Sequence, residues 1–293
     1  MKFLIIGDLH GNKPEIYYED FDAIIAPGDF CSSELIRKMA FLEVKERLKN
    51  PKYDKRWYEI IGKRKAKKIV NESLKRGREI LEFLNSFNVP VFTVPGNWDW
   101  SHFQKDRWKF LKKERFNSYL KKDLKNIINL DGKIRNFKDY QFIGYGKSNS
   151  PEYPQYERDI KRKTYGDLKK AKKRYKKLLQ KYDKLFKKSK KPVIFLSHNV
   201  PFNTSIDKIT DKSSPRKGDH FGSVVARKMI EKYQPLVFIG GHMHEHFGKD
   251  KIGRTVCVNS GYGSFVNIFM ELDGNKIKRL EFKYGKKGKY KPF

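Results

Sequence analysis

The sequence contains only two cysteines, Cys31 and Cys257, among its 293 residues, and neither belongs to a CxxC pair. A disulfide framework and a thiolate zinc site are therefore excluded as the basis of the fold. A chain of this length buries enough apolar surface to fold without such cross-links. We expect both thiols to be reduced, as in a cytoplasmic protein.

Long hydrophobic runs are also missing from the sequence. The first segment, MKFLIIGDLHG, contains an apolar run of four residues, which is too short for a secretory signal or a membrane span. No other segment approaches the ~20 apolar residues that a transmembrane helix needs. The sequence therefore predicts a cytoplasmic location and no membrane partner, and it leaves the oligomeric state open.

Acidic residues are scarce relative to basic ones. There are 34 Asp and Glu against 66 Lys and Arg, which gives a formal net charge of +32. This imbalance favours nucleic acid or another polyanion as a partner, because cationic side chains release counterions from phosphates. The alternative is that lysine only keeps the surface soluble, as in some heat-adapted proteins, although glutamate does not rise with it. Both interpretations stay open.

Short apolar runs, rich in Ile, Val and Phe, recur along the chain, and each ends at a glycine or a polar cluster. They lie at residues 2–8, 22–29, 89–97, 191–199, 235–242 and 255–261. Runs that are continuous rather than alternating are typical of strands buried on both faces. Helical patterns separate them, at 33–48 with Ser33 as the N-cap, at 66–86 and at 223–233. The alternation predicts an α/β fold with largely parallel strands.

Two further helical segments are strongly basic. Residues 157–191 contain 17 Lys and Arg and 4 Asp and Glu, a net charge of +13. Their apolar residues follow a 3, 4, 3, 4, 3 spacing, which predicts a helix with one face on the body and lysines on the other. These residues are Leu168, Ala171, Tyr175, Leu178, Tyr182 and Leu185. The segment 102–125 is basic and aromatic, and it is also predicted to be helical.

The remaining segments predict antiparallel strands. Residues 136–146 alternate in polarity and indicate a half-exposed strand pair, whereas 265–285 indicate a hairpin around the turn DGN. No repeat or linker divides the chain. We therefore expect a single domain over residues 1–293, with basic helical elaborations around 33–86, 102–125 and 157–191.

Side chains suited to metal binding follow five of the apolar runs. They are Asp8 and His10 in GDLHG, Asp29 in GDF, Asn97 in GNWDW, His198 in SHN, and His242 and His244 in GGHMH. The carboxyl ends of parallel strands form one rim, where ligands collect. Alternate residues of an extended chain point the same way, so each Asp-x-His or His-x-His pair is expected to face one site together. Any one of these residues alone is as typical of a turn, a helix cap or the core. Their occurrence after five consecutive predicted strands favours a binding site.

This set of carboxylate, imidazole and amide groups, without thiolate, suits Mn, Fe, Zn, Co or Ni. Seven ligands are too many for one ion, so the sequence predicts two divalent metal ions that share a carboxylate. Such a pair clamps a phosphoryl group and generates a hydroxide nucleophile.

In their order, GDLHG, GDF, GNWD, SHN and GGHMH resemble the motifs of calcineurin-like metallophosphoesterases, and the match spans residues 8 to 244. The resemblance implies two packed mixed β-sheets flanked by helices, a four-layer α/β/β/α sandwich. It also implies that Asp29 bridges two ions and that a metal-bridging hydroxide attacks a phosphate ester in line. By position, one ion would be held by Asp8, His10 and His244, and the other by Asn97, His198 and His242.

One position departs from the family pattern. The family often has a histidine after the Asn of GN, where it protonates the leaving group, and here that residue is Trp98. An indole cannot supply a proton near neutral pH, which weakens the case for esters of simple alcohols. His220, in GDHFGS, and His102 are the candidate replacements, and Ser223 and Arg227 lie near His220 in the sequence.

We therefore predict a two-metal phosphoesterase, manganese being one of the candidate ions, with phosphodiesters as substrates. The predicted catalytic residues are Asp29, Asn97, His198 and His220. Asp99 is expected to orient a ligand, and His246 to be a loop residue near the rim. The alternatives are a nuclease, a nucleic-acid-binding protein with a vestigial metal site, and a metal-dependent interaction scaffold.

Overall fold

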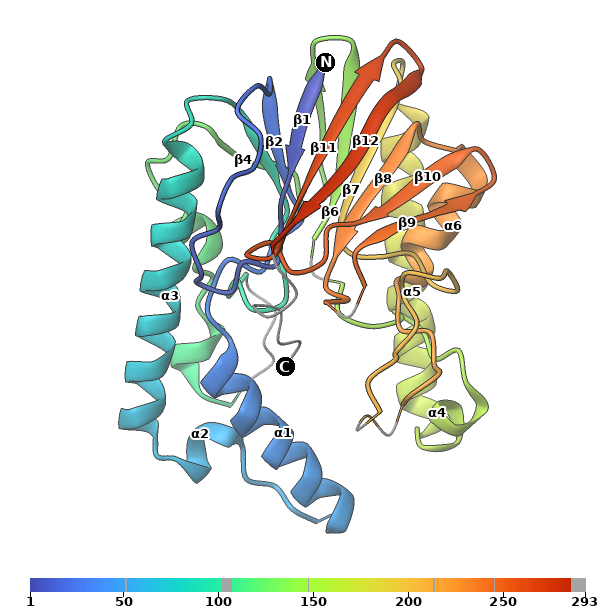
Figure 1. The fold of residues 1–293 in the computed structure, drawn as a ribbon. Helices are drawn as coiled ribbons and strands as arrows, with labels where there is room; N and C mark the ends of the chain where they lie inside the picture. Colours follow the sequence, from blue (N-terminus) through green and yellow to red (C-terminus); the bar gives the residue numbers. More distant parts are fainter. Residues whose placement is uncertain are drawn as a thin grey trace.

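The computed structural model describes residues 1–50, 52–101, 107–146, 148–212, 214, 216–244 and 246–285. Two six-stranded mixed sheets pack face to face, and helices cover their outer faces (Figure 1). This arrangement confirms the predicted four-layer sandwich. The two cysteines are buried and unpaired. None of the described helices is both long and apolar enough to cross a membrane.

The first sheet has the strand order β12-β11-β1-β2-β3-β4. Its central strands pair in parallel, and a C-terminal hairpin adds β11 and β12 antiparallel to β1. The strands are β1 (Lys2–Ile5), β2 (Ala23–Ala26), β3 (Val91–Thr93), β4 (Ile127–Asn129), β11 (Val266–Asp273) and β12 (Lys276–Tyr284). The predicted hairpin over 265–285 is therefore confirmed.

The second sheet has the strand order β5-β6-β7-β8-β10-β9, with parallel strands in the middle and an antiparallel strand at each edge. The strands are β5 (Ile134–Phe137), β6 (Tyr140–Tyr145), β7 (Val193–Asn199), β8 (Val237–Gly241), β9 (Gly248–Ile252) and β10 (Thr255–Asn259). The six predicted runs thus divide equally between the sheets.

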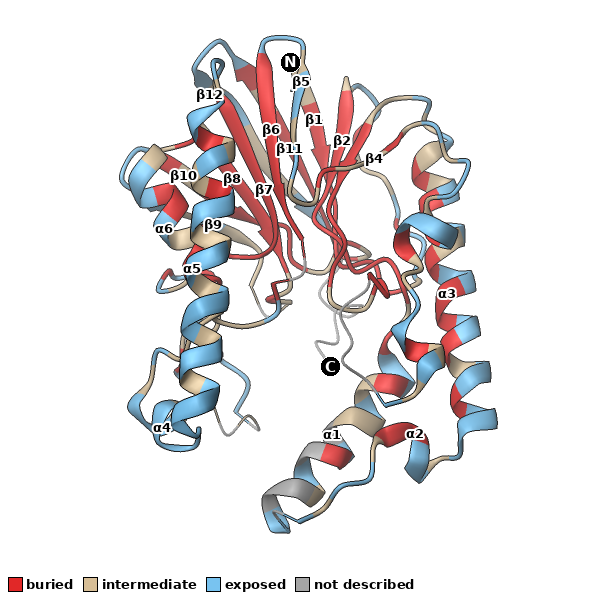
Figure 2. Ribbon diagram, turned by 180° about the vertical axis from the view of Figure 1, so that it is seen from behind, coloured by how far each residue is buried: buried red, intermediate tan, exposed pale blue. Residues whose placement is uncertain are grey.

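The helices form two groups, one on each outer face (Figures 1 and 2). The first group is α1 (Glu34–Lys49), α2 (Trp57–Ile60) and α3 (Lys63–Asn85). The second group is α4 (Glu157–Lys161), α5 (Tyr165–Lys187) and α6 (Val224–Tyr233). On α5 the six predicted seam residues are all buried or partly buried, which confirms its amphipathic pattern.

The strands are buried on both faces, and this explains why their sequences are continuous rather than alternating. In β1, Phe3 and Ile5 point into the core between the sheets, where they pack with residues such as Leu196 of β7. Leu4 and Ile6 point the other way, into the core beneath α3.

The predicted helix over 102–125 is wrong within the residues that the structure describes, 107–125. A 3-10 turn, η1 (Lys109–Lys112), and a π turn, η2 (Phe116–Leu120), stand in its place. Leu111, Phe116 and Leu120 are all buried. A step of five residues turns an α-helix by roughly 140° beyond a full circle, so a continuous helix would expose one of these side chains.

The prediction for 136–146 is correct for the strand pair and wrong for its exposure. All six residues of β6 are buried, because β6 lies inside the sheet and both of its faces are covered. Phe142 stacks on Phe92 of the opposite sheet at 4.1 Å between ring centroids, and Tyr145 packs against Tyr182 of α5 at 4.7 Å. Only the edge strand β5 is partly exposed.

Candidate metal centre

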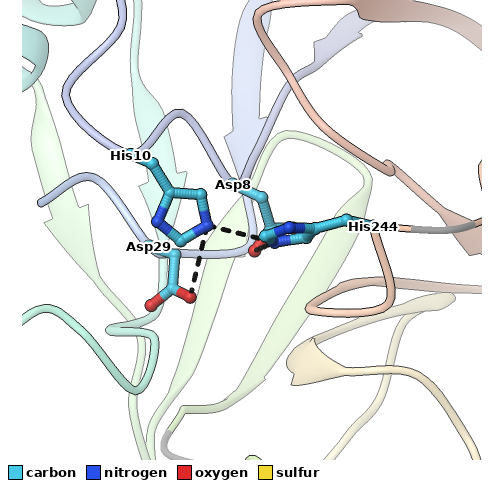
Figure 3. A group of neighbouring side chains, drawn as sticks. All are labelled: Asp8, His10, Asp29 and His244. Carbon is cyan, nitrogen blue, oxygen red and sulfur yellow. Dashed lines mark hydrogen bonds and ion pairs between the residues drawn. The ribbon is translucent and has the colours of Figure 1, made fainter. Parts of the chain in front are cut away.

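The loops that follow β1, β2 and β8 bring Asp8, His10, Asp29 and His244 together (Figure 3). Their potential ligand atoms all lie within 4.8 Å of one another. The Nε2 atoms of His10 and His244 are 3.0 Å apart, and His10 Nε2 lies 3.8 Å from Asp29 Oδ2. We call these four residues the first cluster.

Asp29, His198 and His242 form the second cluster, again within 4.8 Å. His198 Nε2 lies 3.5 Å from Asp29 Oδ2 and 2.9 Å from Asn97 Oδ1, so Asn97 adjoins this cluster. The structure thus brings all seven predicted side chains together, from strand ends of both sheets. Asp29 belongs to both clusters, and its Oδ2 atom faces a histidine of each.

The local backbone differs from the extended chain that the alternating motifs predict. β1 ends at Ile5 and β8 at Gly241, before the ligand-type residues begin. Asp8, His10 and His242 have φ angles of 50°, 46° and 69°, in the left-handed region. His242 and His244 nevertheless face the same centre, His242 in the second cluster and His244 in the first. Left-handed backbone costs about 1–3 kcal/mol per residue and is typical of functional sites.

The carboxylate of Asp99 holds the loop that carries Asp29. Its two oxygens accept the backbone N–H groups of Asp29 at 2.8 Å, Phe30 at 2.7 Å, Cys31 at 3.2 Å and Gly96 at 2.8 Å. Asp99 therefore positions Asp29 through its backbone. A Cβ atom at Gly96 would collide with the Asp29 carboxylate, so only glycine allows this close approach.

The two most buried histidines are oriented through Nδ1. Ser33 Oγ lies 3.1 Å from His10 Nδ1, and His198 Nδ1 donates to Pro27 O at 2.8 Å. Such bonds leave Nε2 as the ligand atom. Ser33, the predicted N-cap, precedes α1 but forms no side-chain cap bond with any described residue, since its hydroxyl faces His10 instead.

Burial sets the charge states of the clusters. Burial raises the pKa of Asp29 well above its usual value, and the charges of Asp99 and Asp8 add to the effect. Burial lowers the pKa of His10 and of His242 well below the ordinary value, and the neighbouring histidines lower both further. The imidazoles of His10 and His242 are therefore neutral, which is the form that binds metal.

The clusters fit divalent cations. Asp8 Oδ1 is buried and accepts no hydrogen bond from any residue that the structure describes, although Asp8 Oδ2 accepts the His242 amide at 2.8 Å. Buried carboxylates without cationic partners are costly unless a metal neutralises them. Oxygen and imidazole ligands without thiolate suit the ions named above.

The other predicted residues have different surroundings. His220 Nδ1 lies 2.7 Å from Oδ1 of the buried Asp207, and His220 belongs to neither cluster among the described residues. Ser223 donates to Glu152 and caps α6, whereas Arg227 binds Glu231 and Asn203 O, so both are engaged within the protein.

The structure describes two of the three remaining predicted positions, His246 and Trp98. His246 Nε2 lies 2.6 Å from Lys208 O, on a loop outside the two clusters as the structure describes them. His102 lies outside the described residues. Trp98 contributes its backbone, since its N–H donates to Asp29 Oδ1 at 2.8 Å, while its ring packs against the core beneath α3.

Sequence reasoning missed three residues beside the clusters. Tyr262 packs on His10 and His244, and Asn12 donates to the Tyr262 hydroxyl at 2.7 Å. Arg37, one helical turn after Ser33 on the same face of α1, acts electrostatically on Asp29, His10 and His242. A signal existed for Tyr262, because it directly follows the sixth apolar run.

Two metal-type clusters that share a carboxylate lie at the strand ends of the two sheets, an arrangement suited to binding divalent metal beside a phosphate ester. The family model of calcineurin-like phosphoesterases matches residues 1–246, and the chain belongs to this family. The protein is accordingly a phosphoester hydrolase that depends on divalent metal.

Individual relatives are distant. An uncharacterized protein of Methanocaldococcus jannaschii is 27% identical over 194 residues, which cover 65% of this chain and 73% of that protein. One solved crystal structure aligns with a TM-score of 0.59 at 14% identity, over 97% of this chain and 98% of the other. A putative 5'-nucleotidase from Staphylococcus aureus aligns with a TM-score of 0.44 at 14% identity, over 97% of this chain and 54% of its own. The likeness with the TM-score of 0.59 concerns the fold alone.

Proposed function

We propose that the protein hydrolyses phosphodiesters with two divalent metal ions. Asp8, His10 and His244 would hold one ion, and Asn97, His198 and His242 the other, with Asp29 between them. One observation carries the proposal: Asp29 Oδ2 lies 3.8 Å from His10 Nε2 and 3.5 Å from His198 Nε2, so a single oxygen faces both ligand groups.

When bound, two such ions supply Lewis acidity toward the phosphoryl oxygens and activate water. The residues of the chain prepare the site for them. Neutral Nε2 atoms face inward because Ser33 and Pro27 engage Nδ1 of His10 and His198. Asp99 fixes the Asp29 loop, so little reorganisation is needed when substrate binds.

Trp98 occupies the position of the family's usual leaving-group acid, so another residue must supply that proton. The Trp98 indole cannot protonate an alkoxide leaving group, and its backbone already binds Asp29. We assign the missing acid to His220. Asp207 accepts five hydrogen bonds, from Asn203 N, Thr204 N and Oγ1, Gly222 N and His220 Nδ1, so its carboxylate is held in place and fixes the imidazole. His220 Nε2 is then the atom that exchanges a proton.

The metals in this proposal are Mn, Fe, Zn, Co or Ni, because the ligand set contains oxygen and imidazole donors without sulfur. Elemental analysis of the purified protein, followed by EDTA treatment and reconstitution with each ion in turn, would identify the active pair. Two ions per chain and recovery of activity are the expected results; a maximum of one ion would contradict the dinuclear assignment.

Nucleic acid is the second candidate substrate, and one observation favours it. Helix α5 carries ten Lys and Arg, all exposed, against two Asp. Both Asp are engaged, Asp167 with Thr164 and Asp183 with Lys187 and Lys232. In Figure 1, α4 and α5 on one side and α1 to α3 on the other extend beyond the carboxyl ends of the strands. Basic helices so placed are suited to the backbone of a nucleic-acid substrate.

Hydrolysis of bis-p-nitrophenyl phosphate with added Mn tests the main proposal. Asp29→Asn and His198→Ala should each abolish turnover, because each removes a group that the proposed metal pair needs. His246→Ala is the matched control, since this histidine lies nearby in the sequence and contacts Lys208 instead. Undiminished turnover in the first two variants would reject the assignment. A panel of monoesters, linear and cyclic diesters, nucleotides, DNA and RNA would then identify the substrate class.

A further inference from the structure

The residues of the metal centre are not equally accessible. Asp8, His10, Asp29 and His198 are buried, whereas Asn97, His242 and His244 are partly exposed. A substrate must therefore approach from the side of the exposed three. On that side, His244 is the partly exposed member of the first cluster, with 13% of its side chain exposed.

Tyr262 lies beside His244. It lies in the loop after β10, and its ring centroid is 5.7 Å from that of His244 and 6.1 Å from that of His10. Its ring plane is inclined by 22° to that of His10, a stacked arrangement. Tyr262 is itself partly exposed, so part of it is accessible to a ligand that approaches the cluster.

The position of Tyr262 is fixed by its surroundings. The Asn12 amide donates to the Tyr262 hydroxyl at 2.7 Å and to His10 O at 3.3 Å, which ties the ring to the first cluster. The carbonyl oxygen of Tyr262 accepts the N–H groups of Phe265 at 2.9 Å and Val266 at 3.1 Å. A side chain held in this way requires little ordering when a ligand packs on it.

The aromatic ring beside the first cluster favours an aromatic ligand. Trp98, beside Asn97, packs its ring against the core beneath α3, whereas the Tyr262 ring packs on the two histidines of the first cluster. Aromatic rings bind planar aromatic groups more strongly than small alkyl groups, because they add stacking to apolar burial.

We propose that Tyr262 contacts the ester substituent of the substrate and selects phosphodiesters in which that substituent is aromatic or heteroaromatic. The inference rests on the proposed phosphodiesterase function and names the substrate class of the same site. In the proposed complex with substrate, the Tyr262 ring packs on the substituent that is not the leaving group. Asn12 keeps the ring in place.

Two esters with the same leaving group provide the test. Phenyl p-nitrophenyl phosphate and methyl p-nitrophenyl phosphate both release p-nitrophenolate and differ only in the second substituent. Tyr262→Leu should raise KM for the phenyl ester about tenfold, the loss expected for one aromatic contact, and change KM for the methyl ester less than about twofold. Tyr262→Phe keeps the ring but loses the Asn12 hydrogen bond, so it should raise KM for the phenyl ester less than Tyr262→Leu does. An equal rise of KM for both esters would overturn the proposal.

A binding measurement separates this proposal from the function on which it rests. Calorimetric titration of the Mn-loaded protein with phenylphosphonate and with methylphosphonate requires no turnover. Tyr262→Leu should weaken phenylphosphonate about tenfold more than methylphosphonate, with the metal content unchanged. Loss of metal, or equal weakening, would instead mean that the ring only positions His10 and His244. Tyr165→Leu, an exposed tyrosine at the start of α5, is the control. If the unmodified protein binds both phosphonates but hydrolyses neither ester, the proposed function fails and the Tyr262 contact is still tested.

Discussion

The carboxylate of Asp99 accepts the backbone N–H of Asp29 at 2.8 Å, and neither residue is exposed to solvent by more than 1%. One buried acid thus fixes the main chain of a second, whose side chain faces both clusters. Asp99 also accepts the amides of Phe30 and Gly96, so the loops after β2 and β3 are joined at this carboxylate. The geometry of the metal centre therefore depends on Asp99, which binds the backbone of Asp29 and is a member of neither cluster.

We expect Asp99→Asn to destabilise the protein by about 1–3 kcal/mol, because an amide NH₂ would face backbone N–H donors and leave at least one unsatisfied. Denaturant unfolding measures this change in the free energy of unfolding. The variant should also bind Mn more weakly, since the Asp29 loop is no longer fixed. Asp139→Asn, an exposed acid, is the control. Unchanged stability together with unchanged metal affinity would contradict the positioning role of Asp99.

Asp29→Asn should stabilise the metal-free protein at neutral pH. Burial, with Asp99 and Asp8, raises the pKa of Asp29 above its unfolded value. The ionised carboxylate is thus disfavoured by folding, and this part of the stability is lost as the pH rises above about 4. In EDTA, the melting temperature of the variant should exceed that of the unmodified protein by about 2–4 °C at pH 7.5, and by less at pH 5.

Added Mn should reverse that order, because only the unmodified protein offers the shared carboxylate oxygen. Thermal unfolding in EDTA and in Mn, at both pH values, makes the comparison. A variant that melts below the unmodified protein in EDTA at pH 7.5 would show that the carboxylate is compensated by protein groups rather than by metal.

The sequence predicts the sandwich and the seven ligand-type side chains because both depend on local signals. Strands buried on two faces have continuous apolar sequences. The residue types of a metal site follow directly after these sequences. The assignment of each side chain to one of two ions remains a prediction. The left-handed φ angles of Asp8, His10 and His242 could not be predicted, since nothing in an Asp-x-His or His-x-His motif distinguishes an extended chain from a turn.

The contacts that the sequence did not predict join segments that are far apart in the chain. Ser33 binds His10 rather than capping α1, and Tyr262 packs on two histidines that precede it by many residues. The irregular segment 107–125 has the composition of a helix, but burial of Leu111, Phe116 and Leu120 on one side requires two separate turns. In each case, tertiary packing decides between conformations that the local sequence allows.

Replacement of three lysines on α5 should weaken nucleic-acid binding if that helix contacts the phosphate backbone. Lys169, Lys173 and Lys176 lie on one exposed stripe of the helix. Changing all three to Gln should reduce the slope of log Kd against log salt by about 2 to 3, in proportion to the charges removed. Fluorescence anisotropy with a labelled single strand measures this slope. Changing Lys249, Lys251 and Lys276 to Gln removes the same charge from β9 and β12 and should leave the slope unchanged. Equal slopes in both triple variants would exclude α5 as the contact.

His220→Gln should affect leaving groups according to their basicity. Since Asp207 fixes Nδ1, we expect His220 to donate a proton from Nε2 to a departing alkoxide, which is worth about 100-fold or more in rate. p-Nitrophenolate leaves without such help. The variant should therefore lose about 100-fold in kcat on a dinucleotide and less than about threefold on bis-p-nitrophenyl phosphate. Asp207→Asn should follow the same pattern more weakly, because it releases the imidazole without removing it. An equal loss on both substrates would mean that His220 only supports the loop between β7 and α6.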